Sequence, residues 1–254
     1  MKKIVFPFLV SCISFSFTLI PSDPAGLPTP DRMVVTGLRV PDPGTALTGL
    51  IESAATRLAD YYYDSIQLDR YGLSRAAMEY AIRGYQHLLQ KGYIDNPDVL
   101  TICDFSLSSR RKRMFLIDLK NYKLILNTYV AHGRRSGGEY ANRFSNRPNS
   151  HESSLGFYVT RNTYFGDHGL ALKIQGVDRG FNDRAGARNI VVHGSDYVGE
   201  DFLETNQFLG RSFGCPAVPR EETETVINTI KGGTCFFIYH PTKKYLAHSK
   251  ILNG

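Results

Sequence analysis

Two short motifs bring a histidine and a cysteine close enough in the chain to form a reacting pair. An apolar run that starts at Asn189 delivers His193, and 22 residues later a Ser-Phe-Gly-Cys stretch ends at Cys215. Cysteine attacks carbonyl groups as a thiolate, and a nearby imidazole can accept the thiol proton and later give it to a leaving group. The two residues therefore predict acyl transfer, with Cys215 as nucleophile and His193 as base.

The turn before the cysteine suits the same chemistry. Gly214 lets the backbone approach a substrate closely, and consecutive amide groups in such a turn can point at the oxyanion that forms during acyl transfer. Pro216 stiffens the chain after the nucleophile. We therefore expect the backbone of this turn to stabilise the oxyanion.

The other histidines and cysteines fit this chemistry less well. His132 and His168 also precede glycines, but only His193 both ends an apolar strand and lies shortly before a Gly-Cys-Pro turn. Cys103 and Cys235 lie within apolar strand patterns, where a cysteine is usually an inert core residue. Whether these two form a disulfide depends on the distance between their α-carbons, which the sequence leaves open.

Composition and motif order argue against several other classes of protein. Papain-like enzymes place their cysteine well before their histidine, and the HExxH motif of zinc proteases is absent. The 30 basic and 24 acidic residues give a net charge of +6, which is low for a dedicated nucleic-acid binder. The dense basic run Arg110 to Arg113 lacks interleaved aromatic residues and is interpreted as a solvated strand start. We therefore expect no metal site and no nucleic-acid partner, and cysteine acyl transfer itself needs no cofactor.

The elements that must position the pair are short strands. Apolar segments separated by Gly, Asn and Asp clusters predict a mainly β and mostly antiparallel fold. The predicted strands are Val99–Cys103, Arg113–Leu119, Lys123–Val130, Leu155–Thr160, Leu170–Gln175, Asn189–His193 and Thr234–Tyr239.

One connection between the strands is a candidate functional loop. The polar segment from Gly133 to Ser154 is too long for a simple connection. Its arginines include Arg134 and Arg143, which are suited to bind the carboxylates of a peptide substrate. We expect the loop to form part of the substrate cleft and to control access to Cys215.

A helical subregion is expected ahead of the strands. Apolar residues recur at helical spacing over residues 45–97, and the second helix has Ser74 as an N-cap and Gly92 as a C-cap. The strands that follow make residues 98–254 the predicted catalytic domain.

The first residues are expected to direct export. Two lysines followed by an apolar run predict a signal peptide over residues 1–25, and several prolines predict an extended linker over 26–44. An uncleaved membrane anchor and a lipoprotein modified at Cys12 are the alternatives. After cleavage we expect no stable membrane insertion.

The motifs resemble those of a known family, the exported L,D-transpeptidases of bacterial cell-wall peptidoglycan with a YkuD-type catalytic domain. The family pattern is His-Gly, about twenty residues, then Ser-x-Gly-Cys, and His193 to Cys215 matches it. Stretches at 130–134, 153–157 and 180–183 are similar to the murein L,D-transpeptidase catalytic subfamily. Many relatives have histidine where Phe213 stands, a departure that bears on the choice of acceptor.

The resemblance implies a β-sandwich-like catalytic domain and a transpeptidase that acts on peptidoglycan stem peptides. Cys215 would attack the carbonyl of the third stem residue and expel the terminal D-alanine, and an amine from a neighbouring stem would resolve the thioester. The implied site is His193 as base, the Gly194 carbonyl orienting its ring, an oxyanion hole from the amides of Phe213, Gly214 and Cys215, Ser212 supporting the turn, and Ser195, Arg134 and Arg143 contacting substrate.

The resemblance also implies a cellular location and leaves two alternative functions open. The enzyme would work after export, in the periplasm or cell envelope. Water in place of the amine would make it an L,D-carboxypeptidase, and loss of catalysis would leave a peptidoglycan-binding module.

Overall fold

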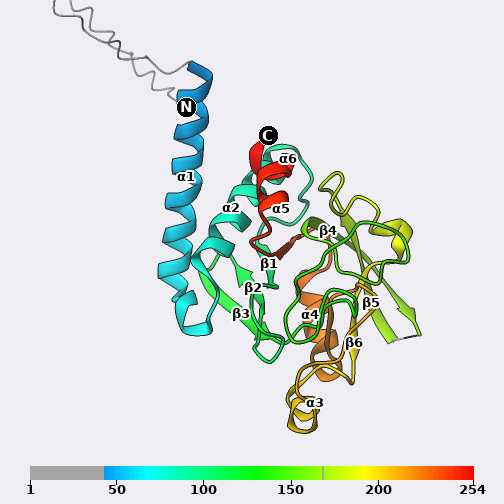
Figure 1. The fold of residues 1–254 in the computed structure, drawn as a ribbon. Helices are drawn as coiled ribbons and strands as arrows, with labels where there is room; N and C mark the ends of the chain where they lie inside the picture. The colour runs from blue at the N-terminus through cyan, green and yellow to red at the C-terminus, as the bar shows by residue number, and fades with distance from the viewer. Residues whose placement is uncertain (1–42, 168) are drawn as a thin grey trace, which may run out of the picture. The chain divides into compact units, whose positions relative to one another are not determined.

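In the described part of the chain, two helices lead into a sheet of eight strands (Figure 1). The computed structural model of the protein describes residues 43–167 and 169–254. The predicted signal peptide, Cys12, almost all of the predicted linker and His168 lie outside the described residues. The helices are α1 (Pro43–Ile66), α2 (Arg75–Gln90), α3 (Glu200–Thr205), α4 (Thr223–Ile230), α5 (Lys243–His248) and α6 (Lys250–Asn253), with short 3-10 segments η1 (Leu68–Tyr71), η2 (Gly186–Arg188) and η3 (Arg220–Glu222). The strands are β1 (Val99–Asp104), β2 (Met114–Asp118), β3 (Lys123–Thr128), β4 (Gly156–Gly166), β5 (Gly169–Gly176), β6 (Val191–Ser195), β7 (Ala217–Pro219) and β8 (Cys235–Tyr239).

Helix α2 begins and ends where local residues favour it. The Ser74 hydroxyl accepts a hydrogen bond from the Ala77 amide at 3.1 Å, as an N-cap does. At the other end Gly92 adopts a φ of 69°, and the Tyr93 amide donates to the Leu88 carbonyl at 2.9 Å. These are the features of a Schellman C-cap, so both predicted helix ends are confirmed.

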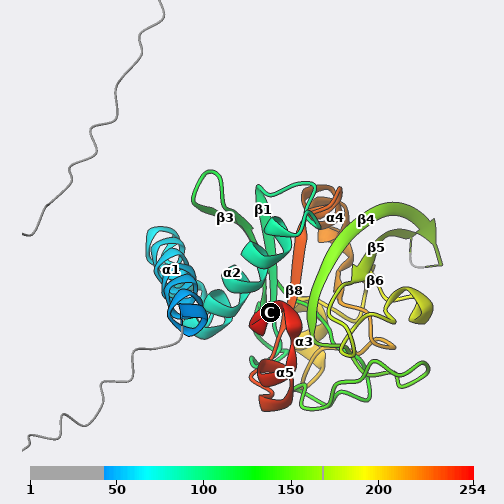
Figure 2. The ribbon, with the colours of Figure 1, turned by 90° about the horizontal axis from the view of Figure 1, so that it is seen from above.

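The strands form one mixed sheet in the order β3-β2-β1-β8-β4-β5-β6-β7. The pairs β1 with β8 and β6 with β7 are parallel, and the other neighbours are antiparallel. An isolated antiparallel bridge joins Ala131, just after β3, to Ala217 in β7. Because this bridge links the two edges, the sheet nearly closes on itself, and the curvature of β4 is plain in Figure 2. The chain after β3 thereby reaches the strand that follows Cys215.

Helices cover the centre of the sheet. Strands β1 and β8 and the first half of β4 are almost entirely buried. Helix α2 packs on β1 and β8, and a β-carbon at Gly84 would lie 2.0 Å from the ring of Phe157 in β4. Phe157 in turn stacks on Phe237 of β8 with 4.1 Å between the ring centroids. The helix and the sheet therefore share one hydrophobic core.

The predicted fold class, mainly β with a helical start, is confirmed. Each predicted strand is present, with its ends shifted by a few residues, whereas β7 has no counterpart among the predicted strands. The boundary between 45–97 and 98–254 stays a prediction, since one core cluster contains residues from both segments. Among the described helices, none has both the length and the apolar character that crossing a membrane requires.

Candidate active site

Cys215 lies at the end of a tight turn that Ser212 holds together. The Ser212 hydroxyl donates to the Cys215 carbonyl at 2.6 Å and accepts from the Gly214 amide at 3.0 Å. Gly214 has a φ of 122°, and a β-carbon there would lie 2.7 Å from the Glu152 carbonyl oxygen. Only glycine fits this position without strain. The Gly214 amide already donates to Ser212, and the oxyanion role of the amides of Phe213, Gly214 and Cys215 stays a prediction.

His193 projects from the strand next to the turn. It lies in β6, where it pairs in parallel register with Ala217 of β7, two residues after Cys215. Its Nδ1 lies 3.0 Å from the Gly194 carbonyl oxygen. A carbonyl oxygen can only accept a hydrogen bond, so Nδ1 carries the proton and the lone pair of the neutral ring lies on Nε2. The ring is thus held in the tautomer that a general base needs.

Gly194 is itself held in a close contact. A β-carbon at this position would lie 2.0 Å from the hydroxyl oxygen of Thr223, at the start of α4. That hydroxyl donates to the Pro219 carbonyl at 3.0 Å, at the end of β7. The absence of a side chain at Gly194 therefore lets α4 and β7 fasten the backbone that orients the His193 ring. Ser195, the last residue of β6, is buried, and its predicted contact with substrate stays a prediction.

The electrostatic surroundings keep Cys215 protonated at rest. Burial raises the pKa of its thiol, while a backbone hydrogen bond with Val191 and the charge of Arg188 act in the opposite direction. The Cys215 Sγ lies 3.6 Å from the Asn189 carbonyl oxygen, an acceptor for a thiol proton. Since the thiol form prevails at neutral pH, attack on a carbonyl requires a base to remove the proton.

Arg188, which the sequence analysis does not single out, ties the candidate loop to the cysteine turn. Its guanidinium group donates to the carbonyl oxygens of Ser145 and Glu152, at 2.7 and 2.6 Å. It also donates to the hydroxyls of Ser154 and Ser150, at 2.5 and 3.1 Å. These partners lie 34 to 43 residues away in the chain, so no local pattern marks Arg188.

The loop from Gly133 to Ser154 does pack on the cysteine turn. The Ser153 hydroxyl donates to the Gly214 carbonyl at 3.3 Å, and the Arg134 amide donates to the Ser212 carbonyl at 2.8 Å. The side chain of Arg134 lies over the Phe213 ring, which is 62% exposed. Arg143 lies further off, with its Nε 4.0 Å from a Glu152 carboxylate oxygen. Of the two predicted substrate arginines, only Arg134 touches the turn, and both roles stay predictions.

A second histidine lies behind the turn. His132, whose carbonyl accepts from the Ser212 amide at 3.0 Å, is buried. Its Nδ1 lies 2.8 Å from the guanidinium of Arg113, which also donates to the carbonyls of Val130 and Leu107. Burial and the charge of Arg113 lower the pKa of His132 to about 3. The interpretation of Arg113 as a solvated strand start is therefore wrong, because backbone carbonyls and an imidazole satisfy its donors inside the fold.

The other two cysteines among the described residues lie in central strands of the sheet. Cys103 in β1 and Cys235 in β8 are fully buried and free, and burial raises the pKa of each thiol. The disulfide that the sequence left open is not formed. Over residues 43–167 and 169–254, no group of three or more His, Cys, Asp or Glu side chains is placed to hold a metal ion.

Comparison with known proteins agrees with the geometry. The family model of the L,D-transpeptidase catalytic domain matches residues 69–239, more than half of the chain. The chain belongs to this family. No curated protein matches its sequence.

Solved structures that resemble the chain include several L,D-transpeptidases at low identity. One from Mycobacterium smegmatis is 9% identical with a TM-score of 0.36, and the match covers 56% of this chain and 59% of that one. One from Enterococcus faecium is 15% identical with a TM-score of 0.35, over 57% and 52% of the two chains. The helical cell shape determining protein Pgp2 from Campylobacter jejuni is 13% identical with a TM-score of 0.36, over 58% and 49%. The match thus spans about half the length of each of these proteins.

Proposed function

We propose that the protein is a peptidoglycan L,D-transpeptidase that uses Cys215 as its nucleophile. The observation that carries the proposal is the hydrogen bond of His193 Nδ1 to the Gly194 carbonyl, one strand away from the cysteine turn. It fixes the neutral tautomer that can deprotonate a thiol whose pKa is raised.

The reaction we propose has two halves. His193 Nε2 accepts the thiol proton as Cys215 Sγ attacks the carbonyl of the third stem residue. The same imidazole then protonates the leaving nitrogen, so that D-alanine departs and a thioester remains. In the second half the amine of a neighbouring stem attacks the thioester carbonyl and His193 accepts the amine proton. An amide bond replaces the C–S bond, and the imidazolium returns the proton to Cys215 Sγ.

The turn would stabilise the charge that develops in both halves. The amides of Phe213 and Cys215 are proposed as oxyanion donors, each worth about 3 kcal/mol in the transition state. Ser212 acts as a positioning residue, since its hydroxyl braces the turn from within. We propose that the protein is exported and carries out this reaction in the periplasm or cell envelope.

The test is the release of D-alanine from a purified stem tetrapeptide, followed by mass spectrometry. Cys215→Ala should lower the rate at least about 1000-fold while circular dichroism and thermal unfolding stay unchanged. Cys103→Ala, which removes a fully buried thiol in β1, is the matched control and should retain the rate per folded molecule. Normal turnover by a folded Cys215→Ala protein would refute the proposal. The mass of the product shows in the same experiment whether an amine or water resolves the thioester.

A further inference from the structure

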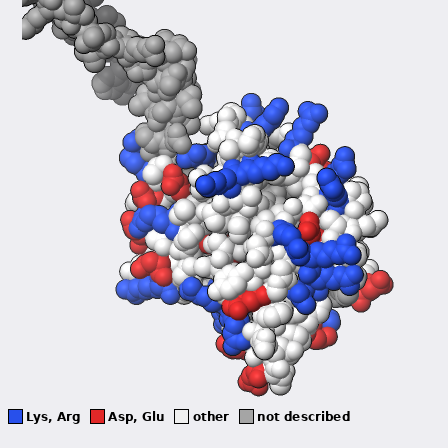
Figure 3. Space-filling model, viewed as in Figure 1, with Lys and Arg blue, Asp and Glu red and all other residues white. Residues whose placement is uncertain are grey.

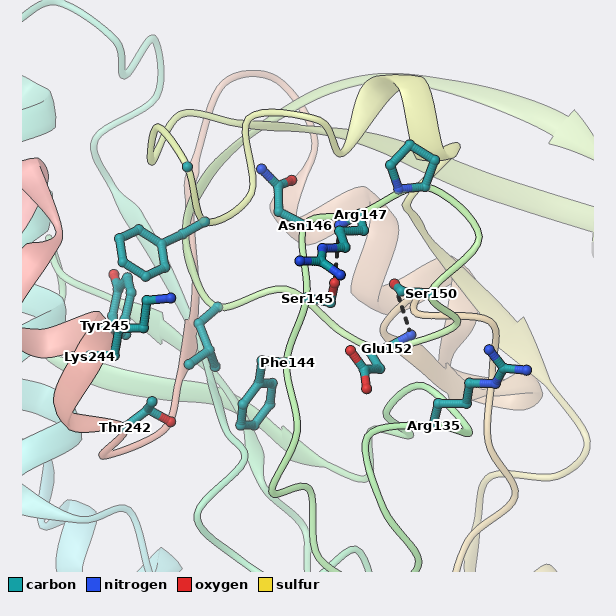
Figure 4. A pocket seen from close by; sticks show the side chains of 14 residues that line it. Arg135, Phe144, Ser145, Asn146, Arg147, Ser150, Glu152, Thr242, Lys244 and Tyr245 are labelled. Atoms are coloured by element: carbon teal, nitrogen blue, oxygen red, sulfur yellow. Dashed lines mark hydrogen bonds between the residues drawn. The ribbon is translucent and has the colours of Figure 1, made fainter.

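A pocket lies beside the cysteine turn, and the proposed chemistry does not use it. It has a volume of about 830 Å³ and is formed by Arg135 and the second half of the loop, by the turn at 180–181 and by the start of α5 (Figure 4). Neither Cys215 nor His193 lines it. Whatever binds in this pocket is therefore held away from the reacting bond.

The floor of the pocket is apolar and rigid. It is made by side chains from three segments, Phe144, Leu155, Phe181 and Tyr245. The rings of Phe181 and Tyr245 meet edge to face at 5.0 Å. Tyr245 is fully buried and its hydroxyl donates to an Asp178 carboxylate oxygen at 2.9 Å. Such a floor can take the aliphatic parts of a ligand without rearranging.

The rim of the pocket is cationic. Arg135, Arg147 and Lys244 line it, and within the described residues none of the three forms an ion pair. By contrast, Arg220 pairs with Asp196 and Arg75 pairs with Asp60. On the face drawn in Figure 3, blue and red side chains alternate at the left, whereas blue ones predominate at the right. The rim therefore offers unneutralised donors for an anion.

One acidic side chain makes the pocket selective. Glu152 lines it together with the three cations, and its carboxylate would repel a ligand that carries only negative charge. The same group can accept a hydrogen bond from an amide or an ammonium group. A ligand that combines carboxylates with N–H donors and short aliphatic groups matches all three parts of the pocket.

We propose that this pocket binds a carboxylate-bearing peptide segment of the substrate at a distance from the scissile bond. The inference rests on the proposed function for the identity of that peptide, a stem peptide with free carboxylates. Glu152 joins the pocket to the site: its side chain lines the pocket, while its carbonyl oxygen accepts from Arg188 and lies against Gly214. Binding energy from the remote segment can thus hold the substrate against the wall that also shapes the cysteine turn.

The experiment measures binding without turnover. The probes are a stem tripeptide that lacks the terminal D-alanine and the same tripeptide with its carboxylates converted to carboxamides, titrated calorimetrically into the purified protein at low salt. The acidic peptide should bind about tenfold more tightly than the amide, and the difference should shrink as salt is added. In the variant Arg135→Gln/Arg147→Gln/Lys244→Gln the two peptides should bind equally. Arg70→Gln, an exposed change in η1 outside the pocket, is the matched control and should retain the preference.

A second measurement separates this proposal from the proposed function. Acylation of Cys215 by a carbapenem, seen as a mass shift of the intact protein, should be unchanged in the triple variant and shows that the variant is folded. A triple variant that acylates normally and still prefers the acidic peptide overturns the pocket proposal, as does a wild-type protein that binds both peptides alike. A protein that never releases D-alanine but shows the preference, lost in the triple variant, refutes the proposed function and leaves the pocket proposal standing.

Discussion

His193 and His132 both precede glycine and both lie beside the cysteine turn, yet their rings are held in opposite tautomers. The Nδ1 of His193 faces a carbonyl oxygen, which can only accept a hydrogen bond. The Nδ1 of His132 faces the guanidinium of Arg113, which can only donate, so Nε2 of that ring carries the proton. A single neighbouring group thus makes one histidine suited to accept a proton on Nε2 and the other not. The dipeptide alone does not define the base.

The largest effect on the rate of acylation is expected from replacing His193 and His132 in turn. His193→Ala should slow acylation of Cys215 by a carbapenem about 100- to 10,000-fold, because the thiol loses its general base. His132→Asn should retain most of the rate, since the asparagine amide oxygen can still accept from Arg113. Intact-protein mass spectrometry over time gives both rates. Equal losses in the two variants would mean that the tautomers do not separate their roles.

Replacing Arg113 tests whether its contacts with His132 and the neighbouring carbonyls stabilise the fold. Arg113→Met should lower the free energy of unfolding by about 3 kcal/mol or more, because three buried acceptors lose their charged donor. Urea denaturation measures the change. Arg111→Met, at an exposed neighbour, is the control and should stay within about 0.5 kcal/mol of wild type. A tolerated Arg113→Met would show that the buried charge contributes nothing net.

The lowered pKa of His132 predicts a dependence of the free energy of unfolding on pH. The pKa of His132 is about 3 in the folded protein, against an ordinary value of 6.5. Between these values the unfolded chain binds a proton that the folded chain does not, so the free energy of unfolding falls as the pH drops from 6.5 towards 3. In His132→Asn this contribution is absent, and the fall should be shallower by about 1 kcal/mol or more between pH 6.5 and 4.5. Parallel curves for the two proteins would contradict the lowered pKa.

The smallest expected effect is that of replacing Arg188 on the reactivity of the Cys215 thiol. Arg113 suppresses charge on an imidazole, whereas the charge of Arg188 lowers the pKa of the Cys215 thiol. Arg188→Met should therefore shift the pH profile of alkylation by iodoacetamide to higher pH and slow the reaction at neutral pH about threefold to tenfold. Cys103 and Cys235 are fully buried and should not contribute. Arg188→Lys should restore part of the rate, and a profile that does not move in Arg188→Met would remove this role.

The sequence predicted those features that depend on interactions between residues close together in the chain. It did not predict those that depend on residues far apart in the chain. The cap at Ser74 and the apolar strands depend on neighbours a few residues away, and both were predictable. Strand β7 is three residues long, ends on proline and exists because β6 lies beside it, so no alternation marks it. Arg113 is charged in a basic run, and only the fold shows that carbonyls and a ring enclose it. The motif that ends at Cys215 was visible locally, but the contacts that support its turn were not.

Between His193 and Cys215 the chain forms a long connection whose two ends, at Tyr197 and Gly210, lie in contact. The Gly210 amide donates to the Tyr197 carbonyl at 2.8 Å, and a β-carbon at Gly210 would lie 2.4 Å from that of Tyr197. The chain between them, which includes α3, therefore leaves and rejoins the fold at one contact (Figure 1), where Val198 and Leu209 lie in one buried cluster with Ala217 of β7. For protein engineering this makes its exposed tip at Asn206 a place where a fluorescent reporter or an affinity tag could be inserted without changing the register of β6 with β7.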